Sequence, residues 1–568
     1  MNLKITFFTI ITSLLATTTS LYSQNPTFEW VKQIGGNGIV VASTITTDLN
    51  ENLLVGGHFR GTADLDPGEA TANFTSNGYT DAFIQKLDAD GNLLWVKKFG
   101  GISEEFAHSI ATDTFGNVYM TGVFAYTVDF NPGGAAATLT ANGDYDTYII
   151  KYDSNGNFQW VKQLGGIEND FGYAIRIDLN GDVYICGFFR ETVDFDPRES
   201  VYNLTSNGDS EAYLLKLNTE GEFIWVKQYG GVLSEYPLAL ALDTGGHIYL
   251  TGDFKGTVDF NPGSGDATLT SAGNEDIFIL KVDGNGDFIW VKQMGSAGVD
   301  KGTSISVDAQ SNVYTTGHFI QTVDFDPGDG VFNMASSGGS NIFVQKLDTN
   351  GNFLWANYMG GLGNDEGVSI TNDADGNIIV TGNFFNRADF DSGAGDLSLT
   401  SEGGYDMFIQ KFDPDGNHIW LRQMGGSGID RTASTVIDAT GKIYTVGYFQ
   451  GSADFNIGQS NGELTSYGSY DGFIQKLSMK TMGLEESTLS SGLTLYPNPT
   501  KGDFSVAFKN EQTKVSIRLF SITGQGLMED QFYNTKKIPL EIHQPNGLYF
   551  LEIIDQQAKK TMMKIVKD

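Results

Sequence analysis

Short runs of alternating hydrophobic and polar positions follow one another along most of the chain, separated by glycine, asparagine and aspartate. This two-residue period predicts β-strands joined by tight turns. After Gly101 we predict strands over Ala107–Ala111, Asn117–Phe124, Thr147–Tyr152 and the run FQWVKQL that begins at Phe158. Short turns join the first two strands and the last two, and a loop of about 22 residues separates the second strand from the third.

The same pattern repeats every 65 residues. Seven tryptophans mark the period: Trp30, Trp95, Trp160, Trp225, Trp290, Trp355 and Trp420. Phenylalanines from Phe59 to Phe449 and glycines from Gly57 to Gly447 keep the same register. Four antiparallel strands at a strict period are typical of β-propeller blades. We interpret the Trp and Phe series as core side chains packed between adjacent blades.

The ends of the repeat region complement each other. The region begins with a lone fourth strand, Phe28–Gln33, and ends with a lone third strand, Phe473–Leu477. Pairing of these two strands would complete the last blade and close the ring. We therefore predict an all-β chain with a seven-bladed β-propeller over residues 24–477. An open solenoid is the alternative, and it would leave both terminal strands unpaired.

The 65-residue period is lost after the propeller region. Residues 478–492 are rich in Ser, Thr, Gly and Glu and are predicted to form a linker. Residues 493–568 contain new alternating runs, such as LTLYPNP and GLYFLEII, with Gly, Pro and Asn turns between them. This pattern predicts a small C-terminal β-sandwich.

Charge separates the two regions and narrows the class of ligand. The chain has a formal net charge of −34. From Leu493 onward the chain has 10 Lys and Arg residues and 8 Asp and Glu residues. The preceding part therefore has 25 basic and 61 acidic residues, a net charge of −36. Such an acidic body repels phosphate backbones, which argues against nucleic acid as a partner. Cations, or neutral ligands such as sugars, fit this charge better.

The N-terminus predicts export. Lys4, the apolar run Ile5–Ala16 and the small or polar residues up to Ser23 are typical of a signal peptide over residues 1–23. The apolar run is too short to span a bilayer, and no later stretch is long enough. The single cysteine, Cys186, lies in a strand pattern and is predicted to be a buried free thiol. We expect the exported protein to be a monomer.

The loops predict which face carries function. Two kinds of loop share one face of the predicted propeller. Those from the second strand to the third are long, and those from the fourth strand to the next repeat vary in sequence. Such loops on a rigid scaffold are the usual place for binding. Acidic residues gather in the loops that lead from the fourth strand to the next repeat: Glu104, Glu105, Glu168, Asp170, Glu235, Asp300, Asp365, Glu366 and Asp430. Solvated acidic loops without a ligand are the alternative interpretation.

The long loop opens in every repeat with an Asp, an apolar residue and then Asp or Asn. Four repeats carry two aspartates: Asp64 and Asp66, Asp194 and Asp196, Asp324 and Asp326, Asp389 and Asp391. Two hard oxygen ligands ahead of a glycine turn could begin a calcium site, although calcium needs more oxygen ligands than this motif supplies. The alternative is an Asx-turn, in which the carboxylate accepts backbone N–H groups. We therefore predict no cofactor and keep these eight residues as calcium candidates.

The sequence contains no recognisable catalytic motif. The six histidines are scattered, although His58 and His318 occupy the same repeat position, and no Gly-x-Ser-x-Gly, His-Glu-x-x-His or phosphate-loop pattern is present. Near-uniform repeats also count against catalysis, because an enzyme needs one asymmetric set of reacting groups. We therefore predict a non-enzymatic protein, while the acidic loops leave room for a carboxylate pair that hydrolyses polysaccharide.

Two sets of motifs resemble known families. LYPNPTKGDFSV, VSIRLFSITGQ, GLYFLEI and the terminal KIVKD resemble the type A C-terminal sorting domain of the type IX secretion system. The repeats, with WVKQ, NVY and an F-I-x-K-L run, resemble the bacterial SBBP β-propeller repeat family. The first resemblance implies export by the type IX machinery to the outer cell surface or the medium. The second resemblance implies the fold and does not indicate a function.

Three functions follow as hypotheses. The first is a secreted or cell-surface binding module for a glycan or protein ligand. The second is an extracellular enzyme acting on polysaccharide, and the third is a structural, adhesin-like spacer. Uniform repeats favour the first and third.

Overall fold

The computed structural model describes residues 25–196, 200–393, 395–459, 461–479, 493–521, 526–555 and 560–567. The chain divides into two compact units, Met1–Met479 and Lys480–Asp568. Within the described residues all regular secondary structure is strand. The signal peptide predicted over residues 1–23 and most of the linker predicted over 478–492 lie outside the described residues.

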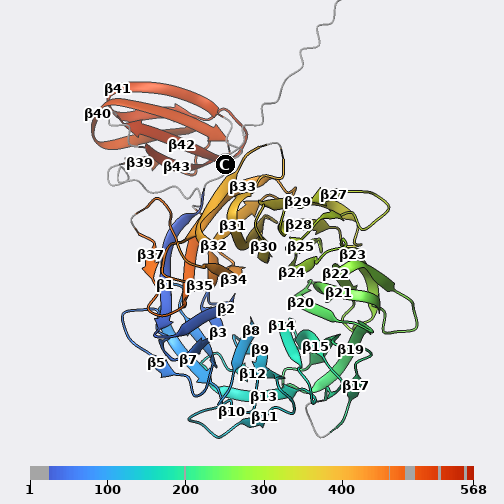
Figure 1. Ribbon diagram of the computed structural model, residues 1–568. Helices are drawn as coiled ribbons and strands as arrows, with labels where there is room; N and C mark the ends of the chain where they lie inside the picture. Colours follow the sequence, from blue (N-terminus) through green and yellow to red (C-terminus); the bar gives the residue numbers. More distant parts are fainter. Residues whose placement is uncertain are drawn as a thin grey trace, which may run out of the picture. The chain divides into compact units, whose positions relative to one another are not determined.

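The first unit is built from a repeated four-stranded antiparallel sheet. In the second repeat the hydrogen-bonded order is β13-β12-β9-β8, so the chain runs outward from the first strand, β8, to the fourth, β13. The short turns have the predicted chemistry: the Asp153 carboxylate accepts the N–H groups of Asn155 and Asn157, and Gly156 has a φ of 78°. Figure 1 shows the repeats arranged around a central opening.

The same pairing of four strands recurs from repeat to repeat among the described residues, and further pairings join some of these groups into larger sheets. The first strands are β2 (Ile39–Thr47), β8 (Glu105–Thr112), β14 (Phe171–Ile177), β20 (Glu235–Leu242), β24 (Lys301–Val307), β30 (Glu366–Asn372) and β34 (Arg431–Ile437). The second strands are β3 (Leu53–Arg60), β9 (Val118–Phe124), β15 (Val183–Phe189), β21 (Ile248–Asp259), β25 (Val313–Phe319), β31 (Ile378–Asp389) and β35 (Ile443–Phe449).

The outer half of each sheet contains the remaining two strands. The third strands are β6 (Asp81–Leu87), β12 (Asp146–Tyr152), β18 (Glu211–Leu217), β22 (Thr268–Val282), β28 (Asn341–Leu347), β32 (Ser398–Phe412) and β38 (Asp471–Ser478). The fourth strands are β7 (Leu93–Phe99), β13 (Phe158–Leu164), β19 (Phe223–Gly231), β23 (Phe288–Met294), β29 (Phe353–Gly361), β33 (His418–Gly426) and β1 (Thr27–Gly36). In the last sheet the N-terminal β1 pairs with the C-terminal β38.

The long connection between second and third strands is more ordered than the sequence predicts. In five repeats it contains a separate three-residue hairpin: β4 (Thr62–Asp64) with β5 (Asn73–Thr75), β10 (Thr127–Asp129) with β11 (Thr138–Thr140), β16 (Thr192–Asp194) with β17 (Asn203–Thr205), β26 (Thr322–Asp324) with β27 (Asn333–Ala335), and β36 (Ser452–Asp454) with β37 (Glu463–Thr465). In the other two repeats the same hairpin continues β21 into β22 and β31 into β32.

Hydrophobic cores lie between neighbouring sheets. One core combines Ile84 and Phe99 of the first repeat with Met120 and Phe124 of the second, and another joins the first repeat to the last. The phenylalanine series from Phe59 to Phe449 is fully buried, which confirms the prediction for it. Six of the seven tryptophans are only partly buried, because each lies at the outer end of its sheet.

The constant Lys and Trp positions connect one repeat to the next. Lys86 Nζ and Trp95 Nε1 both donate to the carbonyl oxygen of Ser154 in the following repeat, at 3.1 and 3.3 Å. The same arrangement recurs for Lys151 and Trp160 on Thr219, Lys281 and Trp290 on Thr349, and Lys346 and Trp355 on Pro414. Their strict period therefore reflects contacts between sheets.

The second unit contains β39 (Leu493–Tyr496), β40 (Asp503–Ser521), β41 (Gly526–Glu541), β42 (Gly547–Asp555) and β43 (Lys560–Lys567). Hydrogen bonds join all five strands, and every pair among them is antiparallel. β40 links the unit, because it pairs with β39, β41 and β42 along its length. A single core that includes Val506, Ile517 and Leu551 holds the unit together.

Candidate ligand-binding site

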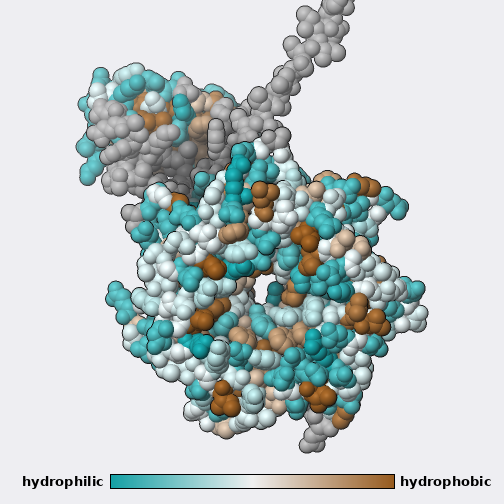
Figure 2. All heavy atoms as spheres, viewed as in Figure 1, coloured by the Kyte–Doolittle hydropathy of each residue, from teal (hydrophilic) through white to brown (hydrophobic). Residues whose placement is uncertain are grey.

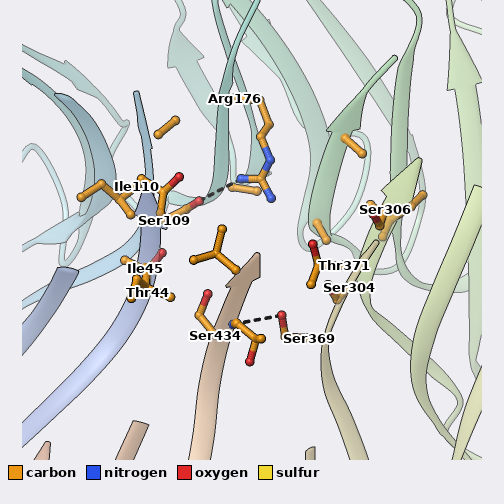
Figure 3. A pocket seen from close by; sticks show the side chains of 18 of the residues that line it. Thr44, Ile45, Ser109, Ile110, Arg176, Ser304, Ser306, Ser369, Thr371 and Ser434 are labelled. Carbon is orange, nitrogen blue, oxygen red and sulfur yellow. Dashed lines mark hydrogen bonds between the residues drawn. The ribbon is translucent and has the colours of Figure 1, made fainter. Parts of the chain in front are cut away.

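The first strands of all seven repeats line a central cavity of about 520 Å³ (Figure 3). Most of its lining consists of Ser, Thr, Ala and aliphatic side chains. Figure 2 shows that the opening stays clear between the side chains, and that hydrophobic spots around it are separated by hydrophilic surface. A cavity to which every repeat contributes can place different side chains around one ligand.

Each first strand contains a β-bulge, and its extra residue lines this cavity. The pairing of β14 with β15 shifts register between Gly172 and Ala174, so that Tyr173 is the additional residue. The residues at this position are Ser43, His108, Tyr173, Leu238, Thr303, Val368 and Ala433. Bulges redirect a side chain out of the regular pleat. The scaffold therefore presents a different residue to the cavity from every repeat.

A second variable position pairs across the first and second strands. The pairs are Val41 with His58, Phe106 with Val123, Phe171 with Phe188, Tyr236 with Asp253, Lys301 with His318, Glu366 with Asn383, and Arg431 with Tyr448. On the second strand this residue stands between the constant Gly and the constant Phe, as His58 stands between Gly57 and Phe59. The glycine is required because a Cβ on Gly57 would lie 2.1 Å from the carbonyl oxygen of Val41.

Aromatic side chains gather on one side of this region. Phe171 stacks on Phe188 with ring centroids 5.1 Å apart, and Tyr236 meets Phe188 edge to face at 5.1 Å. Together with Tyr173 and Leu238 they line a side cavity of about 350 Å³. Tyr173 and Leu238 also line the central cavity, so the two spaces share a wall.

A buried carboxylate faces the same side cavity. Asp253 is fully buried, and Lys301 Nζ of the next repeat lies 3.3 Å from its Oδ1. Oδ2 has no hydrogen-bond partner among the described residues. Burial raises the pKa of Asp253 to about 6, against the lowering effect of Lys301. Lys301 therefore holds Oδ1 in an ion pair, and the buried carboxylate lies beside the aromatic wall of the side cavity.

Charged residues hold the variable positions of the sixth and seventh repeats. Arg431 forms an ion pair with Glu366 of the preceding repeat, and its guanidinium lies 4.1 Å from the centre of the Tyr405 ring. Glu366, Tyr405 and His318 line a further cavity of about 290 Å³. Burial lowers the pKa of His318, so this imidazole is neutral at pH 7.

Most of the acidic loop residues singled out from the sequence are structural. Glu105, Asp170, Glu235, Asp300, Asp365 and Asp430 are buried, and each accepts the backbone N–H of the residue four positions earlier at 2.6–3.3 Å. They therefore fix the turn into each first strand and are not a solvated binding surface, which corrects the sequence interpretation. Glu366 lines a cavity as described above, and Glu104 accepts a hydrogen bond from the Tyr145 hydroxyl at 2.6 Å.

The eight calcium candidates all lie at the start of the outer hairpins, away from the central cavity. Asp64 Oδ1 accepts the N–H groups of Asp66 and Ala72, and Asp66 Oδ1 accepts that of Gly68. The first aspartates of the other pairs, Asp194, Asp324 and Asp389, accept the same two bonds from Asp196 and Tyr202, Asp326 and Phe332, and Asp391 and Leu397. These contacts are those of the Asx-turn alternative. Among the described residues, no three His, Cys, Asp or Glu side chains form a group suited to a metal ion.

Two other sequence observations acquire a structural meaning. Cys186 is a buried free cysteine, as predicted; its thiol lies 3.4 Å from the Pro237 carbonyl oxygen, and burial raises its pKa to about 12. His58 and His318 share a repeat position because both belong to the variable cross-strand pairs. Sequence reasoning noted the coincidence and missed the site. Comparing the seven repeats column by column for variation, instead of constancy, would have found it.

Comparison with known families bears out the resemblances. Residues 494–568 match the family described as a secretion system C-terminal sorting domain. Residues 159–187 and 289–318 match the family described as a beta-propeller repeat. Each propeller match runs from the fourth strand of one sheet to the second strand of the next. The chain thus combines propeller repeats with a type IX sorting domain, which implies secretion or display at the cell surface.

Two curated proteins are similar to much of this chain. The uncharacterized WD repeat-containing protein L264 of Acanthamoeba polyphaga mimivirus is 24% identical over 579 residues, covering 87% of this chain and 41% of that protein. The regulatory protein FlaEY of Caulobacter vibrioides is 23% identical over 429 residues, covering 72% of this chain and 43% of that protein. The chain thus spans less than half the length of either relative.

Among solved structures, Sqt1 from Chaetomium thermophilum aligns with a TM-score of 0.33 and 10% identity, covering 74% of this chain and 97% of that one. Separately, the described part of the chain contains no helix with the length and apolar character to cross a membrane.

Proposed function

We propose that this chain is a non-enzymatic binding module, exported by the type IX machinery, that holds a glycan at the central cavity of a closed seven-bladed propeller. The observation that carries the proposal is the set of seven cross-strand pairs, which differ in every repeat although the residues beside them are constant. Packing alone requires no such variation, because the seven sheets are otherwise alike. A rigid scaffold with one variable surface is the usual form of a binding protein.

Closure of the ring is supported by contacts between the chain ends. Beyond the pairing of β1 with β38, Lys476 Nζ donates to the carbonyl oxygen of Ala89 at 2.7 Å, which repeats the contact between adjacent sheets across the first and last repeats. A closed ring holds the seven variable positions around one axis, so that a ligand meets several repeats at once.

The chemistry of the site favours a glycan over a protein ligand. Sugar rings present a C–H face to aromatic side chains, and Phe171, Tyr173 and Tyr236 line the side cavity together. A recessed cavity also suits a chain end or a short oligosaccharide. A protein ligand would instead need a broad exposed surface.

A hydrolase acting on polysaccharide is the second candidate. The raised pKa of Asp253 suits a general acid near neutral pH. Against this, the carboxylates of Asp253 and Glu366 each pair with a cation from the next repeat, which favours a fixed electrostatic role. A spacer without a ligand would have no need for the variable positions.

The test is a glycan array probed with the purified full-length chain, in calcium and again in EDTA. We expect selective binding that Phe171→Ala and Tyr236→Ala reduce at least tenfold. Phe115→Ala is the matched control, because Phe115 is 84% exposed in a turn between first and second strands. Absence of binding to every glycan, with a folded protein, would overturn the glycan assignment, and release of reducing sugar from a bound polysaccharide would favour the hydrolase.

A further inference from the structure

The central cavity contains one charged side chain among its described lining residues, Arg176. The equivalent positions of the other repeats carry small or medium side chains: Thr46, Ala111, Ala241, Ser306, Thr371 and Val436. Figure 3 shows the Arg176 side chain extending from β14 into the space that the first strands surround. A single arginine in a ring of small residues breaks the sevenfold pattern where a ligand would lie.

The guanidinium of Arg176 has unused hydrogen-bonding capacity. Its Nη1 donates to the Ile175 carbonyl oxygen at 2.8 Å and lies 3.5 Å from Ser109 Oγ. No Asp or Glu among the described residues forms an ion pair with it, in contrast to Lys301 and Arg431. Arginine carries five N–H donors in a planar fork that matches a carboxylate. Placing such a cation in a recessed cavity without an anion is unfavourable, and a bound anion would remove that penalty.

Hydroxyl groups around the cavity add further donors. Ser109, Ser304 and Ser369 each accept the backbone N–H of the next first strand, from Ile175, Ile370 and Thr435, at 3.1–3.3 Å. A hydroxyl that accepts in this way keeps its own proton for donation. The cavity wall is therefore rich in donors, which suits a ligand rich in oxygen acceptors.

The arginine and the aromatic wall belong to one strand. Tyr173 lies three residues before Arg176 on β14, which is roughly 10 Å along an extended strand. Tyr173 lines both the central cavity and the aromatic side cavity. A ligand that contacts both residues must combine a ring with an anionic group and be longer than one ring.

We propose that the central cavity binds an acidic oligosaccharide, with a uronate carboxylate on the guanidinium of Arg176 and a sugar ring against Tyr173. This inference rests on the proposed function and names its ligand class. The acidic exterior opposes the approach of an anion, and at 0.15 M salt the repulsion reaches only about 8 Å. Inside the cavity the local contact with Arg176 decides the affinity.

The test is calorimetric titration of the full-length chain, at 0.15 M salt, with trigalacturonate, trimannuronate and a neutral trisaccharide of the same length. We expect a uronate trimer to bind at least tenfold more tightly than the neutral one. Arg176→Gln should abolish this preference and Arg176→Lys should keep part of it, with unchanged melting temperatures. Arg387→Gln, at an arginine that is 66% exposed, is the matched control.

The outcomes separate this inference from the proposed function. Equal binding of acidic and neutral sugars, or a preference that survives Arg176→Gln, would overturn the inference and leave glycan binding standing. Failure of both uronates, with another array glycan bound in a manner dependent on Phe171 and Tyr236, would also overturn the inference alone. Failure of every glycan would overturn both.

Discussion

Lys301 Nζ lies 3.3 Å from Oδ1 of Asp253, across the boundary between two adjacent sheets. The two residues hold variable positions in neighbouring repeats, so neither is part of the repeating scaffold. The pair stabilises a buried carboxylate beside the aromatic side cavity, and the Oδ2 atom of this carboxylate has no hydrogen-bond partner among the described residues. Asymmetry of this kind is what distinguishes the site from the rest of the repeats.

Lys301→Met should destabilise the protein by roughly 1–3 kcal/mol at pH 8, because it leaves the buried Asp253 carboxylate without its cation. The pKa of Asp253 is already raised to about 6, and loss of Lys301 raises it further, so the loss of stability should be smaller at pH 5, where the carboxyl is largely protonated. Denaturant unfolding at both pH values measures this.

Two variants control that experiment. The double variant Lys301→Met/Asp253→Asn should recover most of the lost stability. Lys227→Met, which breaks a pair with the exposed Asp287, should cost about 1 kcal/mol or less. An equal loss at pH 5 and pH 8 would argue that Lys301 acts through packing alone.

Glu235→Gln should flatten the dependence of stability on pH. Burial raises the pKa of Glu235 to about 9, its Oε2 accepts only the Gly231 N–H, and its Oε1 accepts no bond among the described residues. The unfolded state loses its proton near pH 4.5 and the folded state near pH 9, so the contribution of this group to stability is full below pH 4.5 and declines as pH rises to 9. Melting temperatures between pH 4 and pH 9 measure the effect.

In that series the melting temperature of the Glu235→Gln variant should rise relative to that of the parent protein as pH increases, by about 1–3 °C at pH 9. Glu69→Gln, at an exposed glutamate, should follow the parent throughout. Parallel profiles for Glu235→Gln and the parent would mean that the buried carboxylate is ionised in the folded state.

The effect of calcium on the melting temperature tests whether the outer hairpins bind this ion. Because Asp324 Oδ1 already accepts the N–H groups of Asp326 and Phe332, we expect millimolar calcium to leave the melting temperature unchanged to within about 1 °C. Asp324→Ala should destabilise the protein by about 1–2 kcal/mol with or without calcium, through loss of the turn. A rise in melting temperature with calcium that Asp324→Ala removes would establish the metal site.

Ring closure can be tested by comparing two equivalent lysines. Lys476 Nζ donates to Ala89 O at 2.7 Å across the first and last repeats, and Lys281 Nζ donates to Thr349 O at 3.0 Å between two interior repeats. In a closed ring, Lys476→Ala and Lys281→Ala should each cost about 1.5–3 kcal/mol, since both break a charged hydrogen bond. If Lys476→Ala leaves the free energy of unfolding unchanged while Lys281→Ala lowers it, the ring is open.

Removal of residues 494–568 should block export without unfolding the body. The matched sorting domain is confined to the second compact unit, whose core is separate from those of the propeller repeats. Fractionation of bacterial cells that have a type IX secretion system and express the protein should find the shortened protein in the periplasm and the parent protein at the cell surface or in the medium. Unchanged export of the shortened protein would contradict a sorting role.

Much of the architecture follows from local sequence patterns. Alternating strands, Asp and Gly turns, and a strict 65-residue period predicted the repeated four-stranded sheets, because each property depends on residues close together in the chain. The buried phenylalanines and the buried Cys186 were predictable for the same reason. The motifs of residues 493–568 identified the sorting domain directly, whereas the pairing of β40 with three other strands is known only from the structure.

The candidate site depended on the tertiary structure. Glu105 and Asp170 look like exposed loop acids in the sequence, and only the fold shows that their carboxylates turn inward to backbone N–H groups. Arg176 and Asp253 look unremarkable in isolation, since their importance comes from the cavities that they face. The sequence alone determined the repeat, its strands and its sorting signal through local periodicity. Which side chains meet at the axis was decided by β-bulges and by contacts between residues many positions apart, which no local pattern encodes.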